Sequence, residues 1–305
     1  MATFVSVRKL SLEQMRDIVD RITVASGSET RYRLDSVIQR GGFGAVCRGV
    51  DLHIVPEEII AIKVIPISSS TNHEHLKREV ENLRLLTHPN IAALKDSYNA
   101  TDYLVLAMQL APGNKDLFEA VIDSYPLRKP NWFPESIAKI VFAQIGSAIA
   151  YIHRKGIVHR DIKPENIRYD ERYDSDGSCT ITATLLDFGL SKNTDKAPAI
   201  SILGTPAYIA PEIIRGTGAY TGSCDVWSLA ICMSFCSMGS NILMFDVDTD
   251  DRLRRYSAAD KATYKKQMIE LRAQQRAQLF PRMSQELQHL LGGCLDPIKK
   301  YTSTV

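Results

Sequence analysis

Residues 159–166 read His159-Arg160-Asp161-Ile162-Lys163-Pro164-Glu165-Asn166, and they follow a long helical pattern. This short loop combines a carboxylate that can accept a proton, a cation and an amide that can bind a metal ion. Phosphoryl transfer needs such groups, because it depends on positioning and on offsetting negative charge more than on covalent chemistry. The octapeptide therefore indicates a phosphate-transfer site, whose other parts should lie elsewhere in the chain.

Those other parts occur in order on both sides of the loop. Gly41-Gly42-Phe43-Gly44 lies between two predicted strands, where glycines let backbone N–H groups approach an anion, with an ordinary hairpin as the alternative. Lys63 stands in an apolar strand pattern, where a buried charge needs a partner such as Glu79, and a surface lysine on an edge strand is the alternative. Asp187-Phe188-Gly189 supplies a second metal ligand, and Ala210-Pro211-Glu212 closes the segment that begins there.

The chain resembles the eukaryotic protein kinase family from about Tyr32 to Thr302. The resemblance rests on motifs in the family's order: the glycine-rich loop, Ile60-Ala61-Ile62-Lys63, His88-Pro89-Asn90, the 159–166 loop, Asp187-Phe188-Gly189, Ala210-Pro211-Glu212 and Asp225-Val226-Trp227-Ser228. Lys163 and Gly204-Thr205-Pro206 look like the serine/threonine branch, loosely like calcium/calmodulin-dependent kinases. The implied fold is α+β and two-lobed, with a small antiparallel-sheet lobe carrying one helix and a larger, mainly helical lobe.

The resemblance implies a serine/threonine protein kinase that transfers the γ-phosphate of ATP to a protein hydroxyl with the help of Mg²⁺. Asp161 would orient the hydroxyl and accept its proton, and Lys163 would offset charge on the phosphoryl group. Asn166 and Asp187 would ligate Mg²⁺. The protein substrate would present a serine or threonine.

The resemblance also implies which residues contact the nucleotide. Lys63, steadied by Glu79, would hold the α- and β-phosphates. Leu106 would be the gatekeeper, Ala107 to Gln109 the hinge that bonds the base, and Asp116 a neighbour of the ribose. The full implied set is Ile38, Gly41, Gly42, Phe43, Gly44, Val46, Ala61, Lys63, Leu106, Ala107, Met108, Gln109 and Asp116.

Regulation is implied by Arg160, the type of cation that pairs with a phosphorylated activation segment. Ser201 stands at the spacing before Ala210 at which many resembling kinases carry an activating phosphate, with Thr194 as a second candidate and Thr205 as a further regulatory residue. An upstream activating kinase would then be a partner. An unmodified surface serine is the alternative.

Hydrophobic periodicity divides the chain into three parts. Residues 11–24 have the pattern of an amphipathic helix with a Ser11–Gln14 capping box, in an N-terminal extension over 1–30. Strand patterns at 32–38, 45–50, 59–65 and 103–108 and a helical pattern at 74–86 predict the sheet lobe over 31–108. Helical patterns at 136–153, 224–238, 258–279 and 284–291 predict the helical lobe over 109–305, whose last helix is incomplete where the chain stops at Val305. The joint is expected near Gln109 to Gly113.

Composition excludes some partners. The 37 Lys+Arg against 35 Asp+Glu give a net charge of +2, so no strong field indicates nucleic acid or an anionic membrane. No apolar run approaches the ~20 residues of a membrane span, and Met1-Ala2-Thr3-Phe4 has no signal-peptide character. We expect a cytoplasmic monomer, with a nuclear location as the second choice, and reduced cysteines.

Four residues depart from the family pattern. Gln39 stands where the family has glycine, and Arg168 stands where an aliphatic side chain usually floors the adenine. Lys300 replaces the arginine that normally pairs with Glu212, and Phe235 stands where arginine-directed kinases often have a glutamate. Two alternatives to an active protein kinase follow: a pseudokinase-like binding module with a closed pocket, and a small-molecule phosphotransferase. The second has no reason to carry the motifs at 204–206 and 210–212.

Overall fold

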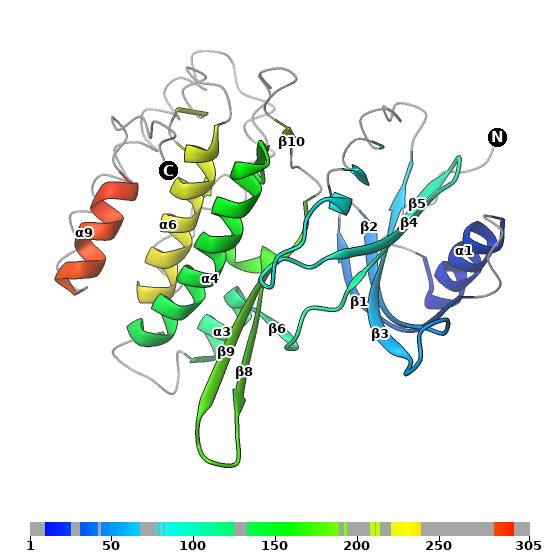
Figure 1. Cartoon of the computed structure of the whole chain (residues 1–305), viewed down its shortest axis with the longest axis horizontal. Coiled ribbons are helices and arrows are strands. Elements are labelled where there is room, and N and C mark those ends of the chain that lie inside the picture. Colours follow the sequence, from blue (N-terminus) through cyan, green and yellow to red (C-terminus); the bar gives the residue numbers. More distant parts are fainter. Residues whose placement is uncertain are drawn as a thin grey trace. The chain divides into compact units, whose positions relative to one another are not determined.

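The computed structural model describes residues 10–25, 31–41, 44–67, 77, 80, 81, 83–124, 133–188, 192, 193, 208–210, 212, 213, 221–238 and 284–295. The chain splits into two compact units, Met1–Ala111 and Pro112–Val305 (Figure 1). An antiparallel sheet dominates the first unit and helices form most of the second, which confirms the predicted fold class.

The sheet of the first unit has five antiparallel strands in the order β1-β2-β3-β5-β4. The strands are β1 (Tyr32–Gly41), β2 (Gly44–Asp51), β3 (Glu58–Pro66), β4 (Leu94–Asn99) and β5 (Tyr103–Gln109). Four of them match the alternating patterns of the sequence. The exception is β4, which the sequence did not predict. Its residues Leu-Lys-Asp-Ser-Tyr-Asn do not alternate between apolar and polar, and the strand forms a polar edge of the sheet.

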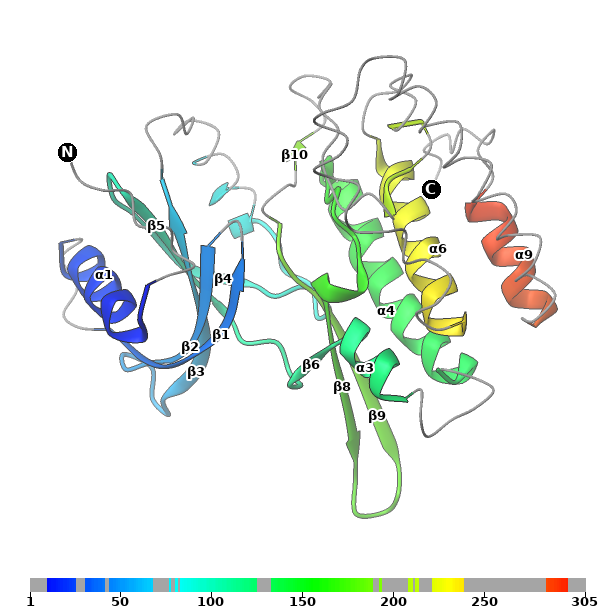
Figure 2. The same cartoon turned by 180° about the vertical axis from the view of Figure 1, so that it is seen from behind.

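Helix α1 (Leu12–Ala25) lies against the sheet of this unit (Figure 1 and Figure 2). Ser11 and Gln14 exchange two hydrogen bonds, Ser11 N to Gln14 Oε1 at 2.8 Å and Gln14 N to Ser11 Oγ at 3.1 Å, so the predicted capping box is confirmed. Met15 and Val19 are fully buried in one core with strand residues such as Ile62. This helix falls within the predicted N-terminal extension over 1–30, and it shares the hydrophobic core of the first unit.

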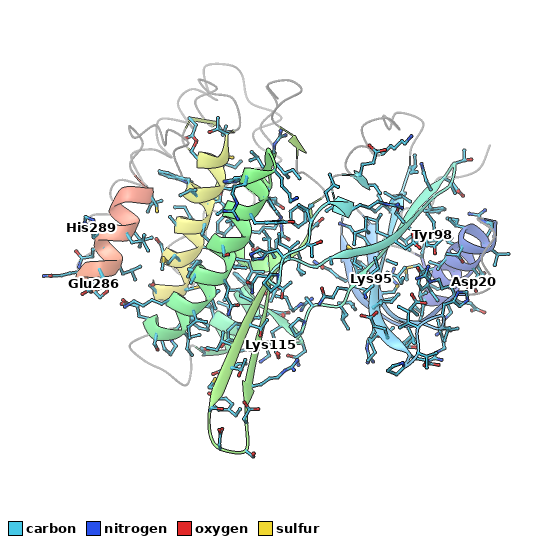
Figure 3. All side chains as sticks on the ribbon, viewed as in Figure 1. Asp20, Lys95, Tyr98, Lys115, Glu286 and His289 are labelled. Atoms are coloured by element: carbon cyan, nitrogen blue, oxygen red, sulfur yellow. The ribbon has the colours of Figure 1, made fainter. Side chains whose placement is uncertain are left out.

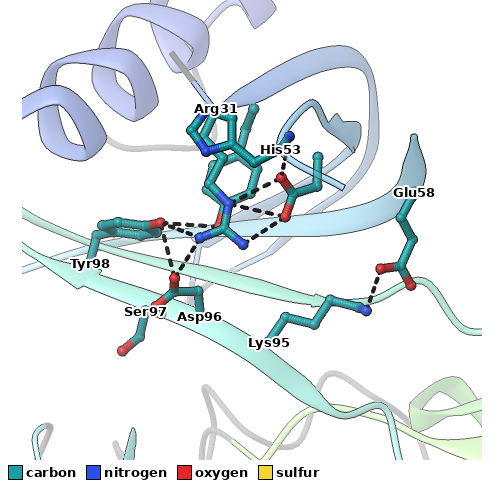
Figure 4. Close-up of polar contacts among 9 residues, drawn as sticks. Arg31, His53, Glu58, Lys95, Asp96, Ser97 and Tyr98 are labelled. Carbon is teal, nitrogen blue, oxygen red and sulfur yellow. Dashed lines mark hydrogen bonds and ion pairs between the residues drawn. The ribbon is translucent and has the colours of Figure 1, made fainter. Parts of the chain in front are cut away.

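Arg31 joins the two edge regions of this sheet (Figure 4). It immediately precedes β1, and its Nη2 donates to Asp51 Oδ2 at 2.8 Å while its Nη1 donates to Asp96 Oδ2 on β4 at 2.9 Å. The same Nη1 lies 3.2 Å from the hydroxyl of Tyr98, whose ring meets that of Tyr32 edge-to-face. A single guanidinium thus connects β1, the end of β2 and β4.

Asp51 is the buried anion of this cluster, with 1% of its side chain exposed. Burial by itself would raise the pKa of Asp51, but hydrogen bonds from Arg31 and from the backbone N–H of His53 outweigh that effect and lower it. The lowered pKa means that the ionised form of Asp51 stabilises the folded state.

The second unit contains helices α3 (Leu117–Ser124), α4 (Glu135–Arg154), α6 (Gly222–Met238) and α9 (Gln285–Cys294). It also contains a three-stranded sheet in the order β6-β8-β9, from Lys115–Asp116, Ile167–Tyr173 and Cys179–Leu185, and a short pair of β7 (Ile157–Val158) with β10 (Lys192–Asn193). The sequence predicted α4, α6 and α9 but neither α3 nor these strands, and the β8–β9 hairpin is rich in charged residues and threonine. The exposed side of α9 carries Glu286 and His289 (Figure 3).

Helix α4 organises the second unit. Its length and apolar composition are sufficient to cross a membrane, but it packs against β9 and α6 and buries residues such as Val141, Ile145 and Ile149, so we interpret it as a core helix. The helix predicted over 258–279 lies outside the described residues. The one predicted over 74–86 is described only at residues 77, 80, 81 and 83–86, and of these Leu85 and Leu86 are not helical.

We predict that Arg31→Met destabilises the protein by about 3–5 kcal/mol at neutral pH, because it leaves the buried Asp51 carboxylate without its guanidinium. The pKa of Asp51 is lowered from 3.8, so its contribution to stability is present above that value and is lost as the pH falls through the folded-state pKa. The difference between the variant and the wild type should therefore shrink in acid. Urea denaturation at several pH values measures both effects.

The matched control is Arg21→Met. Arg21 also pairs with an aspartate at 2.8 Å, but the side chains of Arg21 and Asp102 are 60% and 48% exposed. An exposed pair contributes less than about 1 kcal/mol. Equal losses for the two arginine substitutions would contradict the role assigned to burial of the Arg31 cluster.

Candidate active site

Asp225 on α6 holds the loop that contains Asp161 through hydrogen bonds to its backbone. The carboxylate of Asp225 is fully buried and accepts the backbone N–H groups of His159 and Arg160, each at 2.8 Å. It also lies 2.8 Å from Nε2 of His153 on α4. Arg160 has a φ of 70°, a conformation that a residue with a side chain rarely adopts, and the bond from its N–H to Asp225 helps to hold it there.

Three of the predicted catalytic and metal-binding residues meet in this loop. Nδ2 of Asn166 donates to the backbone oxygen of Asp161 at 2.7 Å and to Asp161 Oδ2 at 3.0 Å. Nζ of Lys163 lies 2.9 Å from the same carboxylate oxygen. Asp161 and Asn166 are both buried, so the carboxylate is held in one orientation by an amide and an ammonium group.

Asp187 reaches the same loop through its neighbours in the chain. The N–H of Leu186 donates to the backbone oxygen of Asn166 at 2.8 Å, and the oxygen of Leu186 lies 3.0 Å from Nε2 of His159. The ring of Phe188 packs edge-to-face on His159, with 4.8 Å between the ring centroids. Asp187 itself has a φ of 55°, so the chain turns sharply at the predicted metal ligand.

Asp116, predicted to lie near the ribose, also caps a helix. Its Oδ1 accepts the N–H of Glu119 at 2.8 Å, while Glu119 Oε2 accepts the N–H of Asp116 at 3.1 Å, so the pair caps the start of α3. Burial and the nearby Glu119 raise the pKa of Asp116, and the opposite charge of Arg168 acts against this. Asp116 pairs with Arg168 across β6 and β8, so their side chains share one face of the small sheet.

In the first unit, several of the predicted nucleotide-binding residues share the sheet face that does not pack on α1. Lys63 pairs with Val46 on one side and with Leu106 on the other, and Ala61 pairs with Met108. Directly paired residues in an antiparallel sheet lie on the same face, so these five form two adjacent rows. Lys63 is buried, and Ile38 is half-exposed on the neighbouring strand.

The glycine-rich turn is described only in part. Gly41 and Gly44 pair at the end of the β1–β2 ladder, and Gly44 has a φ of 141°. A Cβ on Gly44 would come within 2.3 Å of the backbone oxygen of Val64, so only glycine fits this position. Several predicted residues lie outside the described residues: Gly42, Phe43, Glu79, Thr194, Ser201 and Thr205.

The residues of the predicted hinge lie within a strand. Leu106 to Gln109 all lie inside β5, between β3 and β4. Ala107 is fully buried in the core shared with α1, and the N–H of Gln109 already donates to the oxygen of Ala93 at 2.8 Å. The apolar run of the strand gives no sign of where the strand ends, and the segment that follows it begins at Leu110.

Comparison with known protein families matches residues 32–304 to the family described as the protein kinase domain. The chain belongs to the protein kinase family, in its serine/threonine branch. The two units are the two lobes of the kinase fold, which the resemblance in sequence had implied.

Named relatives agree with this membership. Over 207 residues, or 67% of the chain, the kinase is 35% identical to calcium-dependent protein kinase 5 of Plasmodium berghei and covers 34% of that protein. Over 204 residues, or 67% of the chain, it is 33% identical to calcium/calmodulin-dependent protein kinase type 1 of Macrobrachium nipponense and covers 55% of it. Over 202 residues, or 66% of the chain, it is 37% identical to serine/threonine-protein kinase DCLK2 of Rattus norvegicus and covers 24% of it. The chain thus spans between about a quarter and about half of the length of these relatives.

The sequence did not predict one residue that positions β9, the strand before Asp187. Gln144 on α4 donates from Nε2 to the oxygen of Ile181 at 2.9 Å and accepts the N–H of Ala183 at Oε1 at 2.7 Å. Its amide thereby pairs with the outer edge of β9, the strand that leads into Asp187. A polar side chain within an otherwise apolar helix pattern was the available signal, because such a group needs a partner when it is buried.

We predict that Gln144→Leu destabilises the kinase by about 2–4 kcal/mol, since it leaves one N–H and one C=O of β9 without their partner. Thermal and urea unfolding measure the loss, and hydrogen exchange should increase in β9 in particular. Lys139→Met on the same helix is the control, because Lys139 is largely exposed and its pair with Glu135 contributes about 0.3–0.5 kcal/mol. A Gln144 variant as stable as this control would refute the role given to the amide.

Proposed function

We propose that this chain is an active serine/threonine protein kinase that transfers the γ-phosphate of ATP to a serine or threonine hydroxyl of a protein substrate. The observation that carries the proposal is the Asp161 carboxylate, held by the Asn166 amide and the Lys163 ammonium on a loop anchored by a buried aspartate. The named relatives include calcium-dependent and serine/threonine kinases, which supports the choice of substrate class.

The reaction follows from these positions. The substrate hydroxyl would donate a hydrogen bond to the Asp161 carboxylate, which takes the proton as the hydroxyl oxygen attacks the phosphorus of the γ-phosphate. Lys163, 2.9 Å from Asp161 Oδ2, would offset negative charge that develops on the transferred group. Lys63 in the sheet lobe would bind the α- and β-phosphates. The bond to the leaving ADP oxygen breaks as the new phosphate ester forms.

The residues present suit Mg²⁺, which prefers oxygen ligands. Nδ2 of Asn166 is committed to Asp161, and this directs Oδ1 of the same amide away from that carboxylate, where it can serve as a ligand. Asp187 supplies the second oxygen ligand. Bound Mg²⁺ would neutralise charge on the phosphates, while the protein holds the two ligands and the carboxylate base in place.

The base contacts are proposed for the segment after β5, at Leu110 and Ala111, because the backbone of Gln109 is already bonded within the lobe. Met108 would then face the adenine beside Ala61, with which it pairs. We also propose a monomeric cytoplasmic protein, with a nuclear location as the second choice.

We predict that Asp161→Asn lowers the rate of phosphate transfer from labelled ATP to a generic basic protein by roughly 10²- to 10⁴-fold, because the proton acceptor is lost while the shape is kept. Arg172→Met is the control, since Arg172 is an exposed residue of the β8–β9 hairpin. Absence of transfer by the wild type, even after phosphorylation by another kinase, would contradict the proposal and favour the pseudokinase-like binding module.

Regulation by phosphorylation of the activation segment is a second part of the proposal. Arg160 is buried next to the base, and a phosphate of about −2 charge on the activation segment would pair with it and order that segment. Ser201 is the proposed acceptor and Thr194 the second candidate.

We predict that mass spectrometry of the active kinase finds a phosphate on Ser201 or Thr194, and that Ser201→Ala lowers the transfer rate because the partner of Arg160 is lost. Thr194→Ala is the comparison that decides which of the two residues is responsible. Fully active protein with both residues unmodified would overturn this mode of control.

A further inference from the structure

We propose that His153 is a positioning residue for the catalytic loop, and that the absence of a side chain at Gly222 provides the space its ring needs. The inference concerns the same site as the proposed function and rests on it for its effect on catalysis. Both residues lie in the helical lobe, His153 near the end of α4 and Gly222 at the start of α6.

The hydrogen bonds of Asp225 are the first observation. Oδ1 accepts the N–H of Arg160, and Oδ2 accepts both the N–H of His159 and Nε2–H of His153, all at 2.8 Å. Because an ionised carboxylate can only accept, Nε2 of His153 carries the proton in this bond. The imidazole is the one side chain among these three donors, and beside a longer contact from the Cys224 thiol to Oδ1 at 3.9 Å it orients the carboxylate independently of the loop.

The close approach of Gly222 to the imidazole is the second observation. A Cβ on Gly222 would lie 2.7 Å from Nδ1, 2.9 Å from Cε1 and 3.2 Å from Cγ of His153. The first two separations are shorter than nonbonded contacts allow, so any side chain at 222 would displace the ring. His153 is partly exposed and has room to move outward, which would break its bond to Asp225.

The backbone of the loop is the third observation. Arg160 sits at a φ of 70°, where a residue with a side chain is strained, and Asp161 follows it directly. The bond between the N–H of Arg160 and Asp225 opposes relaxation of this strain. A rotated Asp225 carboxylate would weaken that bond and allow the base at Asp161 to move.

The competing explanation is that His153 only fills space between α4 and α6. The two explanations differ in what a side chain of similar size without a donor should do. His153→Phe fills the space and removes the N–H, whereas His153→Gln keeps an N–H donor that can reach Asp225. Gly222→Ala leaves the imidazole intact and displaces it.

The experiment compares amide hydrogen exchange in residues 159–161 with steady-state kinetics for these three variants. We expect His153→Phe and Gly222→Ala each to speed exchange of the His159 and Arg160 amides by about tenfold, the change that weakening of one hydrogen bond produces. We expect kcat to fall by about the same factor, with KM for ATP and for substrate within about twofold of the wild type. His153→Gln should restore most of both properties.

The double variant Gly222→Ala/His153→Phe tests whether the two residues act through one contact. Once the N–H is absent, displacing the ring has little left to break, so the two effects should be less than additive. Gly293→Ala is the matched control, because it adds a methyl group to a helical glycine of α9 where nothing lies within 4 Å. It should leave exchange at the loop and kcat unchanged.

Two results would overturn the proposal: loop exchange unchanged in both His153→Phe and Gly222→Ala, or equal effects of His153→Gln and His153→Phe. The exchange measurement does not require activity, so a wild type that transfers no phosphate refutes the proposed function while the role of His153 is still decided. If His153→Phe fails to fold, Gly222→Ala and His153→Gln carry the test.

Discussion

The carboxylate of Asp225 is the buried charge on which the helical lobe and its catalytic loop depend. A buried carboxylate without partners would cost several kcal/mol, and here two backbone N–H groups of one loop meet that cost together with an imidazole. The loop and the carboxylate stabilise each other. The loop satisfies the charge, and the charge holds the loop in a conformation that its own residues would not adopt alone.

Backbone hydrogen bonds connect this anchored loop to the strand before Asp187. Asn166 receives the N–H of Leu186 at its backbone oxygen and donates its side-chain amide to Asp161, so one residue connects the proposed base with the strand that leads to Asp187. Gln144 holds the far side of that strand from α4. The relative positions of Asp161 and Asp187 therefore depend on backbone contacts as much as on the side chains that a motif displays.

This dependence explains how far sequence alone could lead. The proposed roles of Asp161, Lys163 and Asn166 are implied by a motif whose residues are close together in the chain, and the structure brings these three together. The tasks of Gln144 and His153 were missed, because their partners are backbone groups or residues far away in the sequence. The hinge stays a prediction, since the apolar run of β5 extends almost to Gln109 and periodicity does not mark where ladder bonding ends.

The sheet lobe shows how core packing decides which residues can serve chemistry. Successive side chains of a strand point to opposite faces, so burying Ile62 against α1 turns Lys63 to the other face, and the same alternation separates Ala107 from Leu106. A slip of β3 by one residue would put the Lys63 ammonium into the core around Met15 and Val19, at the cost of an unpaired buried charge. The apolar face of α1 thus enforces the register that presents Lys63, although α1 packs on the opposite face of the sheet.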